Sequence, residues 1–97
     1  MEIEDKLIKE AHVLLHPIRF RIVELLAEKP MHIKSITKAL EGKKKKLVSY
    51  HLDILEEYGF VTSEYEISEK VQSKGKALKK YCVTDKVHEV LLGLKDI

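Results

Sequence analysis

Apolar residues recur along the first two thirds of the chain at the spacing expected of amphipathic helices. They return every three or four residues in segments covering positions 4–16, 18–28, 33–40 and 45–58. Pro17, Gly42 and Gly59 stand at or near the ends of these segments, where proline and glycine commonly bound helices. The pattern therefore predicts four helices before residue 60.

The periodicity changes after Gly59. Bulky residues alternate along 60–67, and a second β-favouring run occupies 77–83, so the two segments predict a hairpin. The polar segment between them contains Gly75 and reads as a long loop, or wing, at about 68–77. A last helix is expected over 85–95.

These elements predict a mainly α fold with a small antiparallel β-hairpin, of the α+β class. No repeat, low-complexity segment or domain boundary interrupts the chain, so residues 1–97 are expected to form one domain. Its parts are a helix-turn-helix, a wing hairpin and two terminal helices, at about 33–58, 60–84, 4–16 and 85–95.

The helix predicted at 45–58 has an unusual distribution of charge. Lys43, Lys44, Lys45 and Lys46 lie at its N-terminal end, where positive charge opposes the helix dipole and costs about 0.3 kcal/mol or more each. No Ser, Thr, Asp or Asn is placed to cap it. A sequence that accepts this local penalty is expected to bind a polyanion, with the first turns of the helix entering a DNA major groove. The alternative is a solvated lysine-rich turn.

The net charge of +2 conceals two basic patches. Positions 31–50 hold six lysines and one glutamate, and positions 70–80 hold five lysines and no acid. Between them, positions 51–69 hold six acids and no Lys or Arg. A fold that brought the two patches to one face would suit nucleic acid.

Other classes of function find little support in the sequence. There is no membrane-length apolar run or signal peptide, so a soluble, cytoplasmic protein without membrane contact is expected. Cys82 alone cannot form a disulfide framework or a multi-cysteine zinc site. Because no catalytic constellation can be argued from spacing, we expect no enzyme, no cofactor, no metal and no identifiable small-molecule effector. A metal site built on His12 and His16, joined by His88 or Asp85 across a dimer, is a minor alternative.

Both terminal helices carry apolar stripes that look too extensive to remain exposed. We expect these helices to pair across a two-fold axis in a homodimer. The predicted interface residues are Leu7, Ala11, Leu14, Val87, Val90, Leu91 and Leu94. The alternative is that the two helices pack only within one chain.

With these elements placed, the chain resembles the prokaryotic ArsR-like winged helix-turn-helix transcription regulators over nearly its whole length. Three stretches carry the resemblance: His16-Pro17-Ile18-Arg19-Phe20-Arg21-Ile22-Val23-Glu24-Leu25-Leu26; Leu47-Val48-Ser49-Tyr50-His51-Leu52 with Leu55 and Gly59-Phe60-Val61; and Gly75-Lys76-Ala77-Leu78-Lys79-Lys80-Tyr81. Each is a packing pattern, and their order and spacing make the signal specific.

The resemblance implies that Lys45, Lys46, Ser49 and Tyr50 face the major groove and that His51 lies at the flank. Lys74 and Lys76 of the wing would approach the backbone or the minor groove. The residue chemistry agrees, since lysines suit phosphates, whereas the hydroxyls of Ser49 and Tyr50 can reach base edges. His51 lies at the edge of the apolar arc, so packing or phosphate binding by this histidine is at least as well supported as base reading.

The chain also departs from the family pattern. The turn at 41–46 is longer than usual and lacks the usual apolar residue and Ser or Thr cap. The paired cysteines of metal-sensing members are replaced by Ile36-Thr37-Lys38, and the last helix has Asp85 and His88 without the distal His and acid. The resemblance therefore points to the branch that does not sense metals.

Two hypotheses of different classes follow. The first is a sequence-specific regulator of transcription, a homodimeric repressor that binds double-stranded DNA. The second is a winged-helix module for protein–protein interaction without specific DNA binding. The lysines on both the helix-turn-helix and the wing favour the first, because a protein-binding surface more often presents an apolar or aromatic patch.

Overall fold

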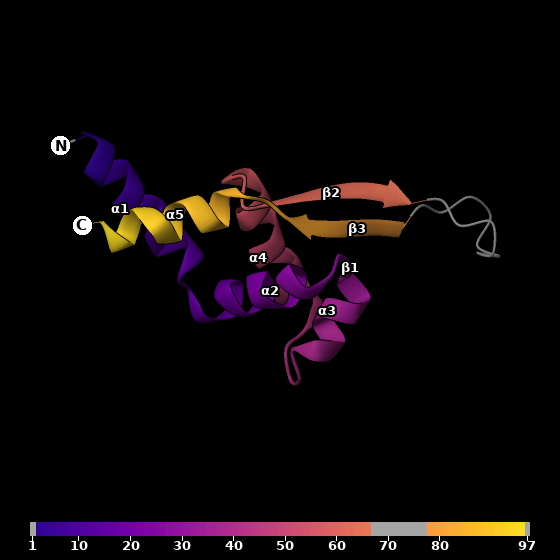
Figure 1. Cartoon of the computed structure of the whole chain (residues 1–97). Helices are drawn as coiled ribbons and strands as arrows, with labels where there is room; N and C mark the ends of the chain where they lie inside the picture. The colour runs from indigo at the N-terminus through magenta and orange to yellow at the C-terminus, as the bar shows by residue number, and fades with distance from the viewer. Residues whose placement is uncertain (1, 67–77, 97) are drawn as a thin grey trace.

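The computed structural model describes residues 2–66 and 78–96. Its five helices are α1 (Glu2–Leu14), α2 (Pro17–Glu28), α3 (Ile33–Ala39), α4 (Lys45–Glu57) and α5 (Lys86–Lys95). Its strands are β1 (Met31–His32), β2 (Val61–Glu66) and β3 (Leu78–Val83). The fold class is the predicted one, mainly helical with a small antiparallel sheet (Figure 1).

The sheet has one more strand than the sequence predicted. Its order is β1-β3-β2, and both pairings are antiparallel. Met31 is opposite Tyr81, and Val61 is opposite Val83. No strand was predicted at Met31 and His32, because a two-residue strand has no periodicity and forms only when β3 supplies its partner.

The hydrophobic core joins the helix-turn-helix to the base of the hairpin. Leu14, Ile22, Ile36, Leu52 and Phe60 are all inaccessible to solvent and come from five different elements or connections. Because α4 shares this core with α2, α3 and the sheet, its buried side is held by packing from Val48 to Leu55.

The end of α4 shows why a glycine follows it. Gly59 has φ of +80°, a left-handed conformation that costs a side-chain-bearing residue energy. Its N–H donates to the carbonyl of Glu56, and the next N–H, of Phe60, reaches back to Leu55 at 2.9 Å. These bonds satisfy carbonyls of the last turn and direct the chain into β2.

The terminal helices α1 and α5 lie side by side at one end of the molecule (Figure 1). The predicted interface residues Ala11, Leu14, Val87 and Val90 are 0–9% exposed within a single chain. The prediction that these four residues form a dimer interface is therefore wrong, because α1 and α5 bury them against each other and the core. Leu7, Leu91 and Leu94 are half-buried and also pack against the core.

Apolar side chains remain exposed on other faces of the same two helices. Ile8 and Leu15 on or just after α1 are 55% and 48% exposed, and Leu92 on α5 is 48% exposed. Ile8 and Leu15 are seven residues apart and so share one side of α1. These residues, together with the half-buried Leu7, Leu91 and Leu94 of the predicted seam, are available for contact with another chain.

Candidate nucleic-acid interface

One side of α4 is packed and the other is open to solvent. Val48, Leu52 and Leu55 are completely buried. On the opposite side Lys45, Lys46 and Asp53 are exposed, Tyr50 is 59% exposed and Ser49 is half-buried. Leu47 is 38% exposed because it falls at the margin of the apolar arc. The open side is therefore polar and cationic toward its N-terminal end.

The open side of α4 and the start of α3 enclose a shallow hollow of about 500 Å³. Its walls are formed by Ile33, Lys45, Lys46, Ser49, Tyr50 and Asp53. The lysines donate hydrogen bonds, the two hydroxyls donate or accept, and the carboxylate accepts. Such a mixture on one helix face can distinguish the donor and acceptor patterns of base pairs in a major groove.

The N-terminus of α4 concentrates positive charge. Its cap is Lys44, whose side chain makes no capping hydrogen bond, and no acid lies in the first turn. The N–H groups of Leu47 and Val48 donate to the carbonyl of Lys44, whereas those of Lys45 and Lys46, at the very start of the helix, have no partner within it. Together the helix dipole and the lysines favour an anion at this end.

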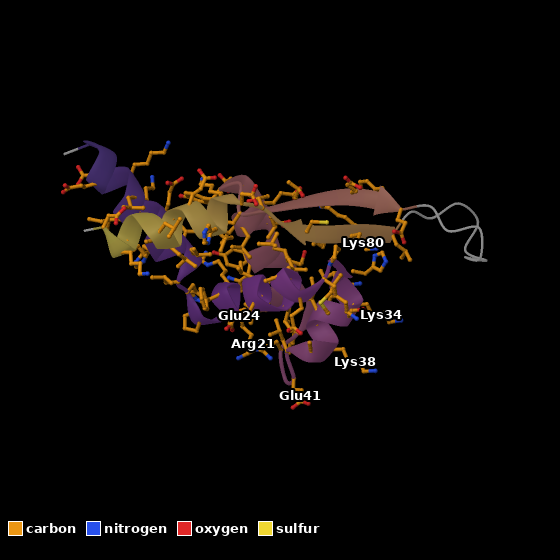
Figure 2. The ribbon with its side chains drawn as sticks, viewed as in Figure 1. Arg21, Glu24, Lys34, Lys38, Glu41 and Lys80 are labelled. Carbon is orange, nitrogen blue, oxygen red and sulfur yellow. The ribbon has the colours of Figure 1, made fainter. Side chains whose placement is uncertain are left out.

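Two further lysines extend the cationic surface. Lys34 and Lys38 are exposed and lie one turn apart on α3, and Figure 2 shows their side chains projecting outward from that helix. The sequence places both in the first basic patch, but they were not predicted to be interface residues. Their spacing of four residues on a short amphipathic helix was the signal that could have placed them together.

The lysines of the helix-turn-helix differ from those of the sheet in their partners. Lys79 lies 3.7 Å from Glu56, and Lys80 lies 3.5 Å from Glu66. Within residues 2–66 and 78–96, no carboxylate forms an ion pair with Lys34, Lys38 or the run 43–46. The cationic charge of the helix-turn-helix is therefore available to an external anion.

His51 is not part of the exposed face. It is 5% exposed, its ring lies 4.6 Å from that of His16, and the ring of Tyr50 packs edge-on against it at 5.1 Å. The prediction that His51 contacts DNA from the flank is corrected: α4 rotates this residue into the core, which leaves the packing alternative. His51 touches the open face of α4 through its edge-on contact with the ring of Tyr50.

The wing lysines Lys74 and Lys76 lie outside the described residues, so their place on the interface remains a prediction. The described part of the hairpin forms its base. There Ser63 donates a hydrogen bond of 2.6 Å to Glu56, which ties β2 to the last turn of α4. The hairpin is thus anchored to the same helix that presents the cationic face.

Other chemistry has no assembled site in the part of the chain that the structure describes. No three His, Cys, Asp or Glu residues among these positions are grouped to hold a metal ion. Cys82 is half-buried and forms no disulfide. None of the described helices is long and apolar enough to cross a lipid bilayer.

Comparisons with known proteins address the same region. The sequence profile of the family described as "Helix-turn-helix domain" matches residues 14–64, which run from the end of α1 into β2. This span contains the complete α3–α4 pair. No curated protein sequence matches the chain at a significant level.

Solved structures extend the likeness to the whole fold. A PadR family transcription regulator from Clostridium difficile has 25% identity and a TM-score of 0.64, with 84% of this chain and 85% of that one covered. A possible transcriptional regulator for arsenical resistance has 24% identity and a TM-score of 0.69, covering 90% and 80%. The ArsR family transcriptional regulator RHA00566 has 12% identity and a TM-score of 0.71, covering 95% and 86%. The last two identities show a shared fold alone.

The family match covers more than half of the chain, and the structural neighbours share the arrangement of helices and hairpin. The resemblance found in the sequence is therefore confirmed. The chain belongs to the helix-turn-helix domain family and has the fold of the ArsR-like winged helix-turn-helix regulators.

Proposed function

We propose that this protein is a DNA-binding transcription regulator that recognises a specific duplex sequence with the N-terminal half of α4. The observation that carries the proposal is the open face of that helix, where Lys45, Lys46, Ser49 and Tyr50 line one hollow. An α-helix fits the major groove, and this face offers both phosphate-binding and base-reading groups.

The residues of this face divide into two roles. Lysines 34, 38 and 43–46 bind phosphates and supply affinity, which falls as salt rises because counterions are released on binding. Ser49, Tyr50 and Asp53 lie farther from the N-terminus of α4. They supply sequence preference through their hydroxyl and carboxylate oxygens. Asp53 accepts a hydrogen bond from a base amino group, since its charge repels phosphate. The wing, at about 68–77, follows the backbone or the minor groove.

The regulator acts as a homodimer. Ile8, Leu15 and Leu92 leave apolar surface on the α1–α5 end of the molecule, which a second copy would cover. A two-fold dimer places two α4 helices about 34 Å apart, on successive major grooves of a near-palindromic site. Repression in the cytoplasm then follows from occupation of a promoter, which excludes other proteins from the same DNA.

The experiment compares two matched pairs of neutralising substitutions. Lys45→Gln with Lys46→Gln removes two cations from the open face of α4, and Lys6→Gln with Lys9→Gln removes two exposed cations from α1. Fluorescence anisotropy measures binding to duplex DNA across a salt series. The first pair is expected to reduce the slope of log affinity against log salt by about 0.9 for each phosphate that the variant no longer neutralises. The second pair should leave the slope unchanged.

Equal slopes for the two pairs would contradict the assignment of α4 to the DNA interface. Weak binding by the unmodified protein, with no preference among sequences, would instead favour the module for protein–protein interaction. The two outcomes are distinct, because the first concerns where DNA binds and the second concerns whether it binds specifically.

A further inference from the structure

Lys86, the first residue of α5, lies where three helices and the sheet meet. Its ammonium group forms an ion pair with the carboxylate of Glu10 on α1 and donates a hydrogen bond to the carbonyl of Tyr58 at the end of α4. The same group lies 5.0 Å from the centroid of the Phe60 ring, between α4 and β2. One side chain thus connects the terminal-helix pair to the end of the recognition helix.

The surroundings of Lys86 make these contacts more consequential than a surface ion pair. The side chain of Lys86 is 32% exposed and that of Glu10 only 14% exposed. The cation also lies at the C-terminal end of α4, where the helix dipole is negative and carbonyls lack helical partners. Removing the cation would leave the largely buried carboxylate of Glu10 without its ion-pair partner. It would also leave the carbonyl of Tyr58 without this hydrogen bond.

Thr84, two residues before Lys86, contacts the same turn between α4 and β2. The hydroxyl of Thr84 shares its single proton between the carbonyl of Gly59, at 2.6 Å, and the more distant carbonyl of Phe60, at 3.2 Å. The backbone N–H of Thr84 also donates to Phe60, at 2.9 Å. Thr84 therefore fixes the end of β3 to the chain that leaves α4. Of the two residues, only Lys86 also contacts α1.

The contacts of Lys86 form a junction between the α1–α5 pair, which would form the dimer, and α4, which would bind DNA. In Figure 1, α5 starts beside the end of α4 and then runs along α1 toward the termini. The α1–α5 pair carries the exposed apolar residues, and α4 carries the DNA-facing residues. A change of angle at the junction would therefore shift each recognition helix relative to the dimer axis.

We propose that Lys86 is a positioning residue that sets the spacing between the two half-sites that the dimer recognises. It does so by joining the end of α4 to Glu10 of α1, and thus holding α4 at one angle to the α1–α5 pair. A displacement of about 3.4 Å along the duplex equals one base pair, so even a small rotation at the junction changes the preferred spacing. This role rests on the dimeric DNA binding proposed above.

The test uses Lys86→Met, which retains an unbranched apolar stem and removes the charge. Lys95→Met is the matched control, because Lys95 is exposed at the other end of the same helix. The half-site is the one enriched by selection from a randomised duplex pool. Each duplex carries two copies of it, separated by the preferred spacing or by one or two base pairs more or fewer. A single half-site is measured in parallel, and a thermal melt establishes that each variant is folded.

The unmodified protein and Lys95→Met are expected to prefer one spacing. Lys86→Met should keep its affinity for the single half-site within about twofold, while its preference between spacings falls by about tenfold, a typical size for coupling between sites. Glu10→Gln removes only the ion pair and retains the bond to Tyr58, so it should flatten the spacing profile less. This second variant also provides the test if Lys86→Met does not fold.

If both variants prefer one spacing as strongly as the unmodified protein does, the role of Lys86 is overturned. The proposed dimeric DNA binding would not be affected by that result. Equal loss of affinity on the half-site and on every spacing would also overturn the role of Lys86, since that is what a purely structural role predicts. If the unmodified protein does not distinguish paired sites from single ones, dimeric recognition fails and this role fails with it.

Discussion

The imidazole rings of His16 and His51 stack behind the open face of α4, with their centroids 4.6 Å apart and their planes inclined by 37°. His16 caps α2, because its Nδ1 accepts a hydrogen bond of 3.2 Å from the N–H of Ile18. His51 belongs to α4, and its buried Nδ1 has no hydrogen-bond partner among the described residues. The pair therefore joins the start of α2 to the recognition helix.

This arrangement favours neutral histidines. Burial lowers the pKa of His51, and the neighbouring His16 and Arg19 lower it further. Burial also lowers the pKa of His16, with smaller contributions from Arg19 and His12. Both rings accept protons more readily in the unfolded chain than in the folded one, so the free energy of unfolding decreases as pH falls below about 6.5.

Urea unfolding at pH 7.5 and at pH 5.5 measures this dependence. The unmodified protein should be less stable at pH 5.5, and His51→Leu should lose less stability between the two pH values because it removes one of the two groups. His88→Leu is the control, since His88 is exposed on α5. The account is contradicted if the unmodified protein is equally stable at both values, or if His88→Leu reduces the pH dependence as much as His51→Leu does.

Tyr50 and Lys44 should have separable effects on DNA binding. Tyr50→Ala removes a hydroxyl and an exposed ring from the hollow, so discrimination against a mismatched base pair should fall by about 1 kcal/mol or more. Lys44→Ala removes a phosphate contact, so affinity should fall by a similar factor on every sequence. Anisotropy with the enriched duplex and its single-base variants separates the two effects. A uniform loss from Tyr50→Ala would contradict its base-reading role.

The location of the dimer interface can be tested with a charge. Leu92→Glu places a carboxylate in the exposed apolar surface of α5 and should shift the protein toward monomers in sedimentation velocity. Tyr65→Glu is the control, because Tyr65 is exposed at 72% on β2, away from the terminal helices. A dimer that persists in Leu92→Glu would place the interface elsewhere on the molecule.

The glycine after α4 provides a test of backbone conformation. Gly59→Ala should destabilise the fold by about 1 kcal/mol, because a residue with a Cβ is strained at φ of +80°. The strain is conformational, since the nearest side-chain atom to an added Cβ would be Cδ of Lys86 at 3.6 Å. Gly59→Asn should cost less, because asparagine tolerates this conformation better. Equal stabilities of all three proteins in urea unfolding would contradict this explanation.

The fold class and the open face of α4 could be predicted because both follow from local periodicity. Val48, Leu52 and Leu55 recur at helical spacing, and this spacing alone separates the packed side of α4 from Lys45, Lys46 and Tyr50. Gly59 marks the end of the helix by its own conformational freedom. None of these conclusions depends on which other element packs against α4.

The remaining features depend on contacts between distant parts of the chain. An apolar stripe on α1 predicts burial of Leu14 but not whether α5 of the same chain or another chain covers it. His51 lies at the edge of the apolar arc, and its burial depends on neighbours distant in sequence, such as the ring of His16, the N-cap of α2. The junction at Lys86 could not be predicted for the same reason, since Glu10 lies far from it in sequence.

The most direct test of the account is selection from a randomised duplex pool, followed by anisotropy measurements on the enriched sequences across a salt series. The account predicts an enriched near-palindrome with half-sites about one helical turn apart, bound at least about 10³-fold more tightly than unrelated duplexes. It also predicts a steep loss of affinity with salt. Weak binding without enrichment would contradict sequence-specific recognition by α4.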